Sequence, residues 1–109
     1  MSMANPWAGE VSLEMDGKSH VLKLTLGSLA ELEAGLASGS LVDLVQRFES
    51  GGYCTRDVLA LIVAGLRGGG WQGTPEDILT VEITGGAMQA ARVAAQLLAR
   101  AFSVPDVAT

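Results

Sequence analysis

The stretch that decides the fold is TLGSLAELEAGLASGSLVDLVQRF, residues 25–48. It contains two residue pairs with the spacing of a capping box, in which a side-chain oxygen and a carboxylate satisfy free N–H groups at a helix start. Ser28 with Glu31 predicts that one helix begins at Ser28, and Gly39 is suited to the left-handed conformation that ends it. Ser40 with Asp43 predicts a second helix directly afterwards. The stretch therefore predicts two helices that meet at a tight corner.

Apolar residues alternate with polar ones on both sides of an Asp16-Gly17 turn signal, which is typical of a β-hairpin. The alternating apolar residues are Val11, Leu13 and Met15 before the turn and Leu22, Leu24 and Leu26 after it. A two-residue loop would pair Met15 with Lys18, a four-residue loop would pair it with His20, and both place the apolar set on one face. An isolated hairpin is only marginally stable, so this face must lie against helices.

The remaining chain predicts further helices. Thr55 can cap a third helix that runs to about residue 67 and is apolar on nearly every side, so it either lies at the centre or faces a partner. Thr74-Pro75 predicts a short fourth helix, and residues 78–84 either continue it or turn extended. The last helix is expected to bury one stripe, formed by Met88, Ala91, Ala95, Leu98 and Phe102. The predicted fold is α+β, with an N-terminal antiparallel hairpin followed by a bundle of four to five short helices.

Length and composition predict one domain. The 109 residues are 49% apolar, and we expect a lead-in at residues 1–8, a single α+β domain at 9–102 and a flexible tail at 103–109. The net charge of −5 opposes binding to nucleic acid or to an anionic membrane. The N-terminus lacks the basic and apolar regions of a secretory signal, and residues 58–66, the longest apolar run, are too short to span a bilayer. Folding in the cytoplasm is expected.

No reactive constellation is visible in the sequence. His20 is the only histidine and Cys54 the only cysteine, so neither a metal site nor a cofactor site is expected. A nucleophilic Cys54 assisted by His20 is a remote alternative to a small, partly buried residue at a helix entry. Gly17-Lys18-Ser19 resembles the end of a phosphate-binding loop but lacks the earlier glycine that this motif requires.

Two groups of apolar residues are candidates for contact with a partner. Trp7, Tyr53 and Trp71 lie outside the periodic segments, and aromatic residues on loops are favoured anchors at interfaces. The second group lies on the all-round apolar helix and comprises Val58, Leu59, Ile62 and Leu66. Core packing is the alternative for both groups.

Three segments carry a family resemblance when they are read in order: NPWAGEV at residues 5–11, LTLGSLAELE at 24–33 and AGLRGGG at 64–70. Together they resemble the small phage-tail proteins encoded by alphaproteobacterial gene transfer agents and related prophages. The resemblance implies a non-enzymatic tail assembly chaperone that binds the tape measure protein or the tail tube protein in the bacterial cytoplasm. A structural, tail-tube-related component of the particle tail is the alternative. The resemblance leaves open whether the protein forms a homo-oligomer. The family carries no catalytic residues to transfer.

Overall fold

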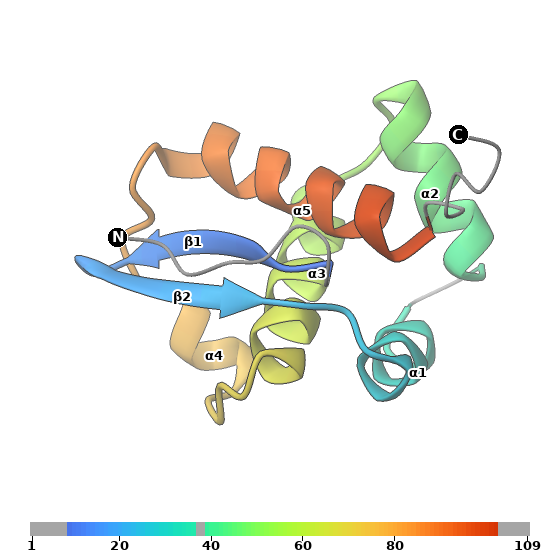
Figure 1. Ribbon diagram of the computed structural model, residues 1–109. Helices are drawn as coiled ribbons and strands as arrows, with labels where there is room; N and C mark the ends of the chain where they lie inside the picture. Colours follow the sequence, from blue (N-terminus) through green and yellow to red (C-terminus); the bar gives the residue numbers. More distant parts are fainter. Residues whose placement is uncertain (1–8, 37–38, 103–109) are drawn as a thin grey trace, which may run out of the picture.

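A two-stranded hairpin and five helices make up the described chain, which in this computed structural model comprises residues 9–36 and 39–102. The elements are β1 (Val11–Met15), β2 (Lys18–Leu22), α1 (Leu26–Ala34), α2 (Leu41–Ser50), α3 (Thr55–Gly68), α4 (Pro75–Ile78) and α5 (Gly86–Phe102). In Figure 1, α3 crosses behind the hairpin, α5 and α4 lie on either side of it, and α1 and α2 lie at one end. The predicted α+β fold is confirmed. The predicted lead-in, with Trp7, and the predicted tail lie outside the described residues, so the proposed domain limits stay a prediction.

The hairpin closes through a two-residue turn. Asp16 and Gly17 both have positive φ, 51° and 79°, as a type I′ turn requires, and Met15 pairs with Lys18. Of the two loop lengths that the pattern permits, the shorter is therefore the one adopted. The inner face of the hairpin is buried, as predicted, through Val11, Leu13, Met15 and Leu22. The prediction for Leu26 is wrong: its side chain is 86% exposed because the strand has already ended and α1 has begun.

The segment after α4 returns to the free edge of β1. Ile83 forms a bridge with Met15, and the neighbouring Asp16 N–H donates to the Glu82 carbonyl over 2.8 Å. The Asp16 carboxylate in turn accepts from the Glu82 N–H over 2.9 Å. Within residues 78–84, for which two conformations are open, the helix ends at Ile78 and a turn follows, and the extended conformation is found at Ile83. These bonds attach the segment after α4 to the hairpin turn across 66 residues of sequence.

The N-cap of the first helix lies three residues before Ser28, the N-cap that the Ser28–Glu31 spacing predicts. Thr25 is the N-cap, and its Oγ1 accepts from the Ser28 N–H over 3.0 Å. The reason is tertiary: the Lys23 N–H donates to the Gly65 carbonyl over 2.9 Å, so the chain leaves the hairpin at once. Ser28 is buried inside the helix. The helix also ends early, at Gly35, so Gly39 adopts its left-handed φ of 87° in the connection and does not cap the helix.

The starts of the other helices follow local signals more closely. Ser40 and Asp43 form the predicted capping box of α2, and Gly51 ends that helix with φ of 79°. The N-cap of α3 is Cys54, one residue before the predicted Thr55, because the Asp57 carboxylate accepts from the Cys54 N–H over 3.1 Å. The short helix α4 begins as predicted, with Pro in its first turn.

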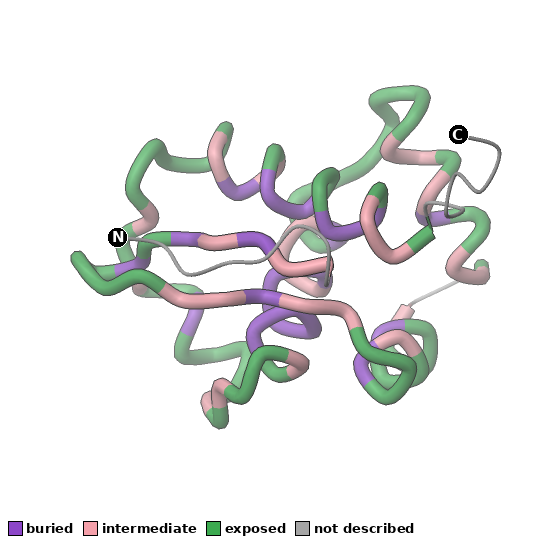
Figure 2. Tube along the Cα trace, viewed as in Figure 1, coloured by how far each residue is buried: buried purple, intermediate pink, exposed green. Residues whose placement is uncertain are grey.

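Two hydrophobic clusters share α3 and α5. One lies between these helices and the hairpin, and the other joins them to α1 and α2. Figure 2 shows the buried positions along α3 and on the inner side of α5. The predicted stripe of α5 is wrong except for Leu98, because the buried residues are Ala90, Val93, Ala94, Leu97 and Leu98. Alanines occur all around this helix, so the periodicity does not determine which face of the helix turns toward the core. Met88, expected on the buried face, is 74% exposed.

Candidate functional site

An apolar groove of about 640 Å³ opens between α3, α4 and α5. Four segments contribute to it: the entry and first two turns of α3, the end of α4, the extended segment after α4, and the first turns of α5. The groove is lined by Tyr53, Cys54, Thr55, Val58, Leu59, Ile62, Ile78, Leu79, Ile83, Ala87, Met88, Ala90 and Ala91. We refer to it as the α3–α5 groove.

The floor of the α3–α5 groove is part of the hydrophobic core. Ile62 is 1% exposed and Ile78 is 7% exposed, and Val58 and Leu59 are half-buried beside them. Across from α3, the start of α5 presents mainly alanines. Because these side chains are short, they leave open space where leucines would have filled the gap. The groove is therefore a consequence of small residues facing large ones.

Large apolar side chains surround this floor and remain exposed. Leu79 is 68% exposed, Met88 is 74% exposed and Tyr53 is 37% exposed. They are three of the six exposed large hydrophobic side chains in the described part of the chain. The other three, Leu26, Val42 and Phe102, are distributed over α1, α2 and the end of α5. A contiguous apolar surface of this kind is typical of a protein-binding site, whereas single exposed residues are not.

Tyr53 is held at the groove by interactions between α2 and α3. Its ring stacks on Phe48, with 4.4 Å between ring centroids and 6° between the planes. Next to the stack, the Arg47 guanidinium donates two hydrogen bonds of 3.0 Å to the Asp57 carboxylate, which is nearly buried. These bonds from Arg47 hold the pKa of Asp57 below its usual value, and they raise the pKa of Arg47. The Arg47–Asp57 pair joins α2 to α3, and Tyr53 lies in the connection between these two helices.

The structure brings together four of the residues that the sequence proposes for partner contact: Tyr53, Val58, Leu59 and Ile62. Leu66 lies elsewhere, fully buried in the core, where it reaches no surface. Sequence reasoning missed Leu79 and Met88 altogether. Leu79 follows the last residue of a four-residue helix, so no periodic pattern marks it, and Met88 was assigned to the buried stripe of α5.

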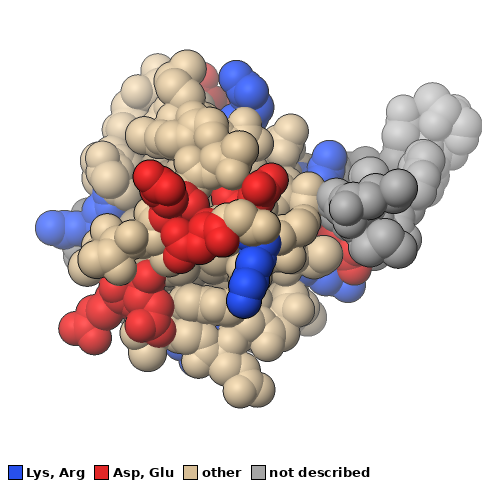
Figure 3. Space-filling model, turned by 90° about the vertical axis from the view of Figure 1, so that its left-hand side faces the viewer, with Lys and Arg blue, Asp and Glu red and all other residues tan. Residues whose placement is uncertain are grey.

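The end of the molecule beside the α3–α5 groove is acidic. A second hollow, of about 570 Å³, adjoins the groove by sharing Ile83 and Ala87, and its lining includes Asp16 and Glu82. Acidic side chains gather on this face (Figure 3). The hairpin, α4 and the segment after it contribute five acids, Glu14, Asp16, Glu76, Asp77 and Glu82, and a single lysine, Lys18, at the start of β2. This acidic hollow and the groove form one continuous surface.

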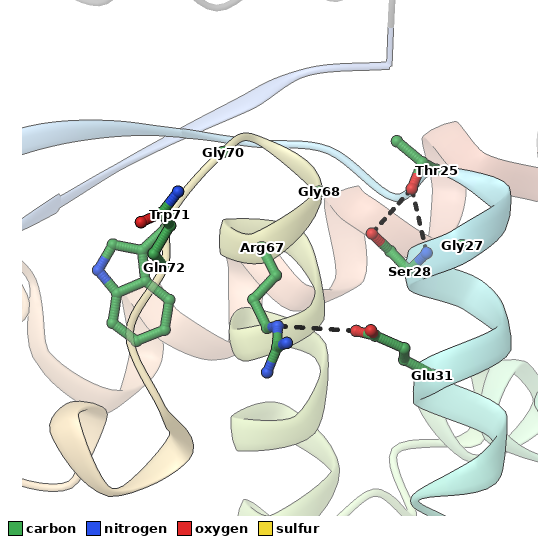
Figure 4. Close-up of a pocket in the computed structure, with 9 residues that line it drawn as sticks. All are labelled: Thr25, Gly27, Ser28, Glu31, Arg67, Gly68, Gly70, Trp71 and Gln72. Atoms are coloured by element: carbon green, nitrogen blue, oxygen red, sulfur yellow. Dashed lines mark hydrogen bonds and ion pairs between the residues drawn. The ribbon is translucent and has the colours of Figure 1, made fainter.

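Trp71 lies at a different hollow, of about 500 Å³, between α1 and the loop after α3. Figure 4 shows Trp71 on one side of it, the α1 residues on the other and Arg67 between them. The Arg67 Nε is 3.7 Å from the Glu31 carboxylate, and both side chains are well exposed, so this ion pair contributes little stability. The Trp71 ring is half-buried and packs against the hydrophobic core, so much of its surface is used internally.

The residues considered for chemistry are not assembled into a reactive site. His20 lies in β2 opposite Leu13, Cys54 is the N-cap of α3, and no hydrogen bond joins them in the described part of the chain. Cys54 is exposed, so the expectation of a partly buried thiol is wrong. Within residues 9–36 and 39–102, no three acidic, histidine or cysteine side chains form a group that could hold a metal. The helices of the same ranges include none that is long and apolar enough to span a membrane.

Comparison with known proteins assigns the family. Residues 8–104 match the family described as "Phage tail tube protein, GTA-gp10". No curated protein and no solved structure matches the chain. The family match covers most of the sequence and confirms the resemblance that its three segments carry. The chain belongs to the gene transfer agent family of phage tail tube proteins.

Proposed function

We propose that this protein is a non-enzymatic tail assembly chaperone, which holds an apolar segment of the tape measure protein or of the tail tube protein in the α3–α5 groove. It would act in the bacterial cytoplasm while the tail polymerises. The observation that supports this function is the gathering of Tyr53, Leu79 and Met88 around one apolar groove. Covering a large apolar side chain contributes about 1.5–3 kcal/mol, so such a site favours an apolar client.

The small number of exposed apolar side chains at the groove, Tyr53, Leu79 and Met88, favours reversible binding. Association costs at least about 4 kcal/mol in lost freedom of motion, which offsets much of the gain from a few covered side chains. Permanent subunit interfaces usually bury more than about 2,000 Å² in total. A client held in the α3–α5 groove can therefore be released as the tail assembles, which a chaperone requires.

A structural subunit of the tail tube is the second candidate, and the description of the family favours it. A ring of identical subunits needs two complementary surfaces on each subunit, one for each neighbour. Three of the six exposed large apolar residues of the described chain line a single groove, and this concentration favours the chaperone. Mass spectrometry of purified particles distinguishes the two: copies in ring multiples would support the tube subunit, and absence from the particle would support the chaperone.

Co-expression with the neighbouring tape measure protein, or with the tail tube protein, tests the chaperone function. The double variant Leu79→Ser/Met88→Ser removes two exposed groove residues, and Leu26→Ser/Val42→Ser removes two exposed residues elsewhere. We expect the wild type and the second variant to keep the client soluble. We expect the groove variant to lose most of that effect while folding normally.

Two outcomes would overturn the proposal. The first is that the wild-type protein increases the solubility of neither client. The second is that the groove variant keeps its client as soluble as the control variant does. Folding of both variants is checked by circular dichroism before the comparison, so that a loss of solubility is assigned to the groove surface.

A further inference from the structure

We infer that the occupant of the α3–α5 groove is an amphipathic α-helix with basic residues at the end that lies over the acidic hollow. This inference rests on the proposed function, because it assumes that the groove binds a segment of a tail component. It adds the secondary structure of that segment, its charge and its direction along the groove.

The backbone of the groove walls favours a helical occupant. The walls consist mainly of α3 and α5, and beyond the first turn of each helix their backbone N–H and C=O groups are engaged within the helix itself. An extended segment in the groove would bury its backbone groups without partners, which costs free energy for each group. A helix satisfies its own backbone and presents side chains only. The groove thus matches the binding mode in which an apolar helix face lies in a hydrophobic groove.

The alanines of α5 give this helix room to approach. Ala87, Ala90 and Ala91 line one wall, and Val58, Leu59 and Ile62 line the other. Helices pack about 8–10 Å apart, and the shorter distances require small side chains at the contact. Leucine-sized side chains of the occupant can therefore point between the alanines toward α3. The exposed Leu79 and Met88 then cover the two sides of the occupant.

Charge sets the direction of the occupant. The acidic hollow continues the groove past Ile83 and Ala87, and Asp16 and Glu82 lie in its lining. The lining of the groove itself contains no Asp, Glu, Lys or Arg side chain. Lysine or arginine residues of the occupant are therefore attracted to the end of the groove that lies over the hollow. Charges at the rim of an interface act in this way on orientation and on partner choice.

Binding of two synthetic helical peptides tests the inference. Both are about 18 residues long, rich in alanine and with leucines on one stripe, and one carries three lysines at one end where the other carries three glutamates. Fluorescence anisotropy measures the dissociation constant of each at about 0.05 M and about 0.3 M salt, where screening differs strongly. We expect the lysine peptide to bind at least about tenfold more tightly at low salt, and the difference to shrink at high salt.

Two charge variants locate the contact. Glu82→Lys reverses a charge in the acidic hollow, and Glu49→Lys makes the same change in net charge on α2, away from the groove. Glu82→Lys should weaken binding of the lysine peptide by roughly fivefold or more, and Glu49→Lys should leave it within about twofold. Leu79→Ser/Met88→Ser should weaken both peptides.

The results separate this inference from the proposed function. If the groove variant weakens binding but the two peptides bind equally well, or the two charge variants behave alike, the basic end is wrong and the groove function stands. If the lysine peptide binds the groove variant as tightly as it binds the wild-type protein, the groove is not its binding site and the inference fails. Failure of the proposed function is a separate result, seen when co-expression gives no client protection that depends on the groove.

Discussion

The two ends of α3 are built in opposite ways. At the C-terminal end the helix touches its neighbours through its backbone: the Lys23 N–H donates to the Gly65 carbonyl, and a Cβ at Gly65 would lie 2.7 Å from the Leu97 side chain. At the N-terminal end the side chains of α3 face alanines across open space, and Tyr53 stays exposed at the rim. One end is closed by contact, and the other is open.

This difference separates the part of the helix that maintains the fold from the part that is available to a partner. Glycines remove the side-chain layer and let β2 and α1 approach directly, which leaves no space for a client. Large residues opposite small ones leave a gap whose apolar lining gains free energy when a partner covers it. Substitutions of the glycines at the closed end should therefore destabilise the protein, and substitutions of the exposed groove side chains at the open end should change binding.

The largest effect is expected from Gly68→Ala at the closed end. A Cβ at this position would overlap the Lys23 carbonyl oxygen and lie 2.6 Å from the Ser28 Oγ, so the backbone of α1 and β2 would have to move. We expect the free energy of unfolding to fall by roughly 3 kcal/mol or more, measured by urea denaturation.

Gly27→Ala is the matched control for this substitution. Gly27 lies in the first turn of α1, and the nearest atom to a Cβ there is the Thr25 Oγ1 at 3.8 Å. Because alanine suits a helix better than glycine does, this variant should gain up to about 1 kcal/mol. Equal stability of the two variants would contradict the close approach at the closed end.

The next largest effect is expected from Asp57→Asn, between α2 and α3. The variant loses the charge-assisted bonds from Arg47, and we expect it to be less stable by roughly 2 kcal/mol near neutral pH. Since the pKa of Asp57 is lowered in the folded protein, this contribution is complete above the unfolded pKa of about 3.9. It is lost as the pH falls through the lower, folded pKa.

Unfolding curves of the wild type and Asp57→Asn at several pH values check this prediction. The difference in stability should be constant above the unfolded pKa and should shrink at more acidic pH. The exposed Glu49→Gln serves as the control and should follow the wild type throughout. A difference that persists unchanged to the lowest pH would show that the ion pair is not its source.

Tyr53→Ala should have a smaller effect on stability and a clear effect on binding. Loss of the stack on Phe48 costs about 1 kcal/mol, because this contact lies at the open end and is partly exposed. Tyr53→Phe keeps the ring and should retain both stability and client protection. Thermal unfolding and co-expression measure the two properties, and loss of binding in Tyr53→Phe would point to the hydroxyl in place of the stacked ring.

The smallest effect on stability is expected at the open end itself. Leu79→Ser/Met88→Ser changes two side chains that are largely exposed, so the free energy of unfolding should stay within about 0.5 kcal/mol of the wild type. The same variant should lose client protection, as proposed above. A large loss of stability would mean that these side chains belong to the core and would remove the contrast between the two ends.

Much of the candidate site was predictable from sequence as a set of residues, but its location was not. Val58, Leu59 and Ile62 were proposed for partner contact because apolar residues exceed what one helix face can bury, and Tyr53 because it is an aromatic residue outside the periodic segments. The alternative, core burial, also applies: Ile62 and Leu66 lie in the core. Which apolar residues become exposed depends on what packs against them, and sequence spacing carries no information on that.

The sequence by itself determined the hairpin with its Asp16-Gly17 turn, the capping box of α2 and the start of α4, because each depends on residues a few positions apart. Only the tertiary structure decided where α1 begins, which way α5 turns, and that Ile83 pairs with Met15. In each of these cases the local pattern does not contain the information that decides the outcome. Contacts between distant segments, such as the bond from Lys23 to Gly65, stabilise the arrangement that is observed.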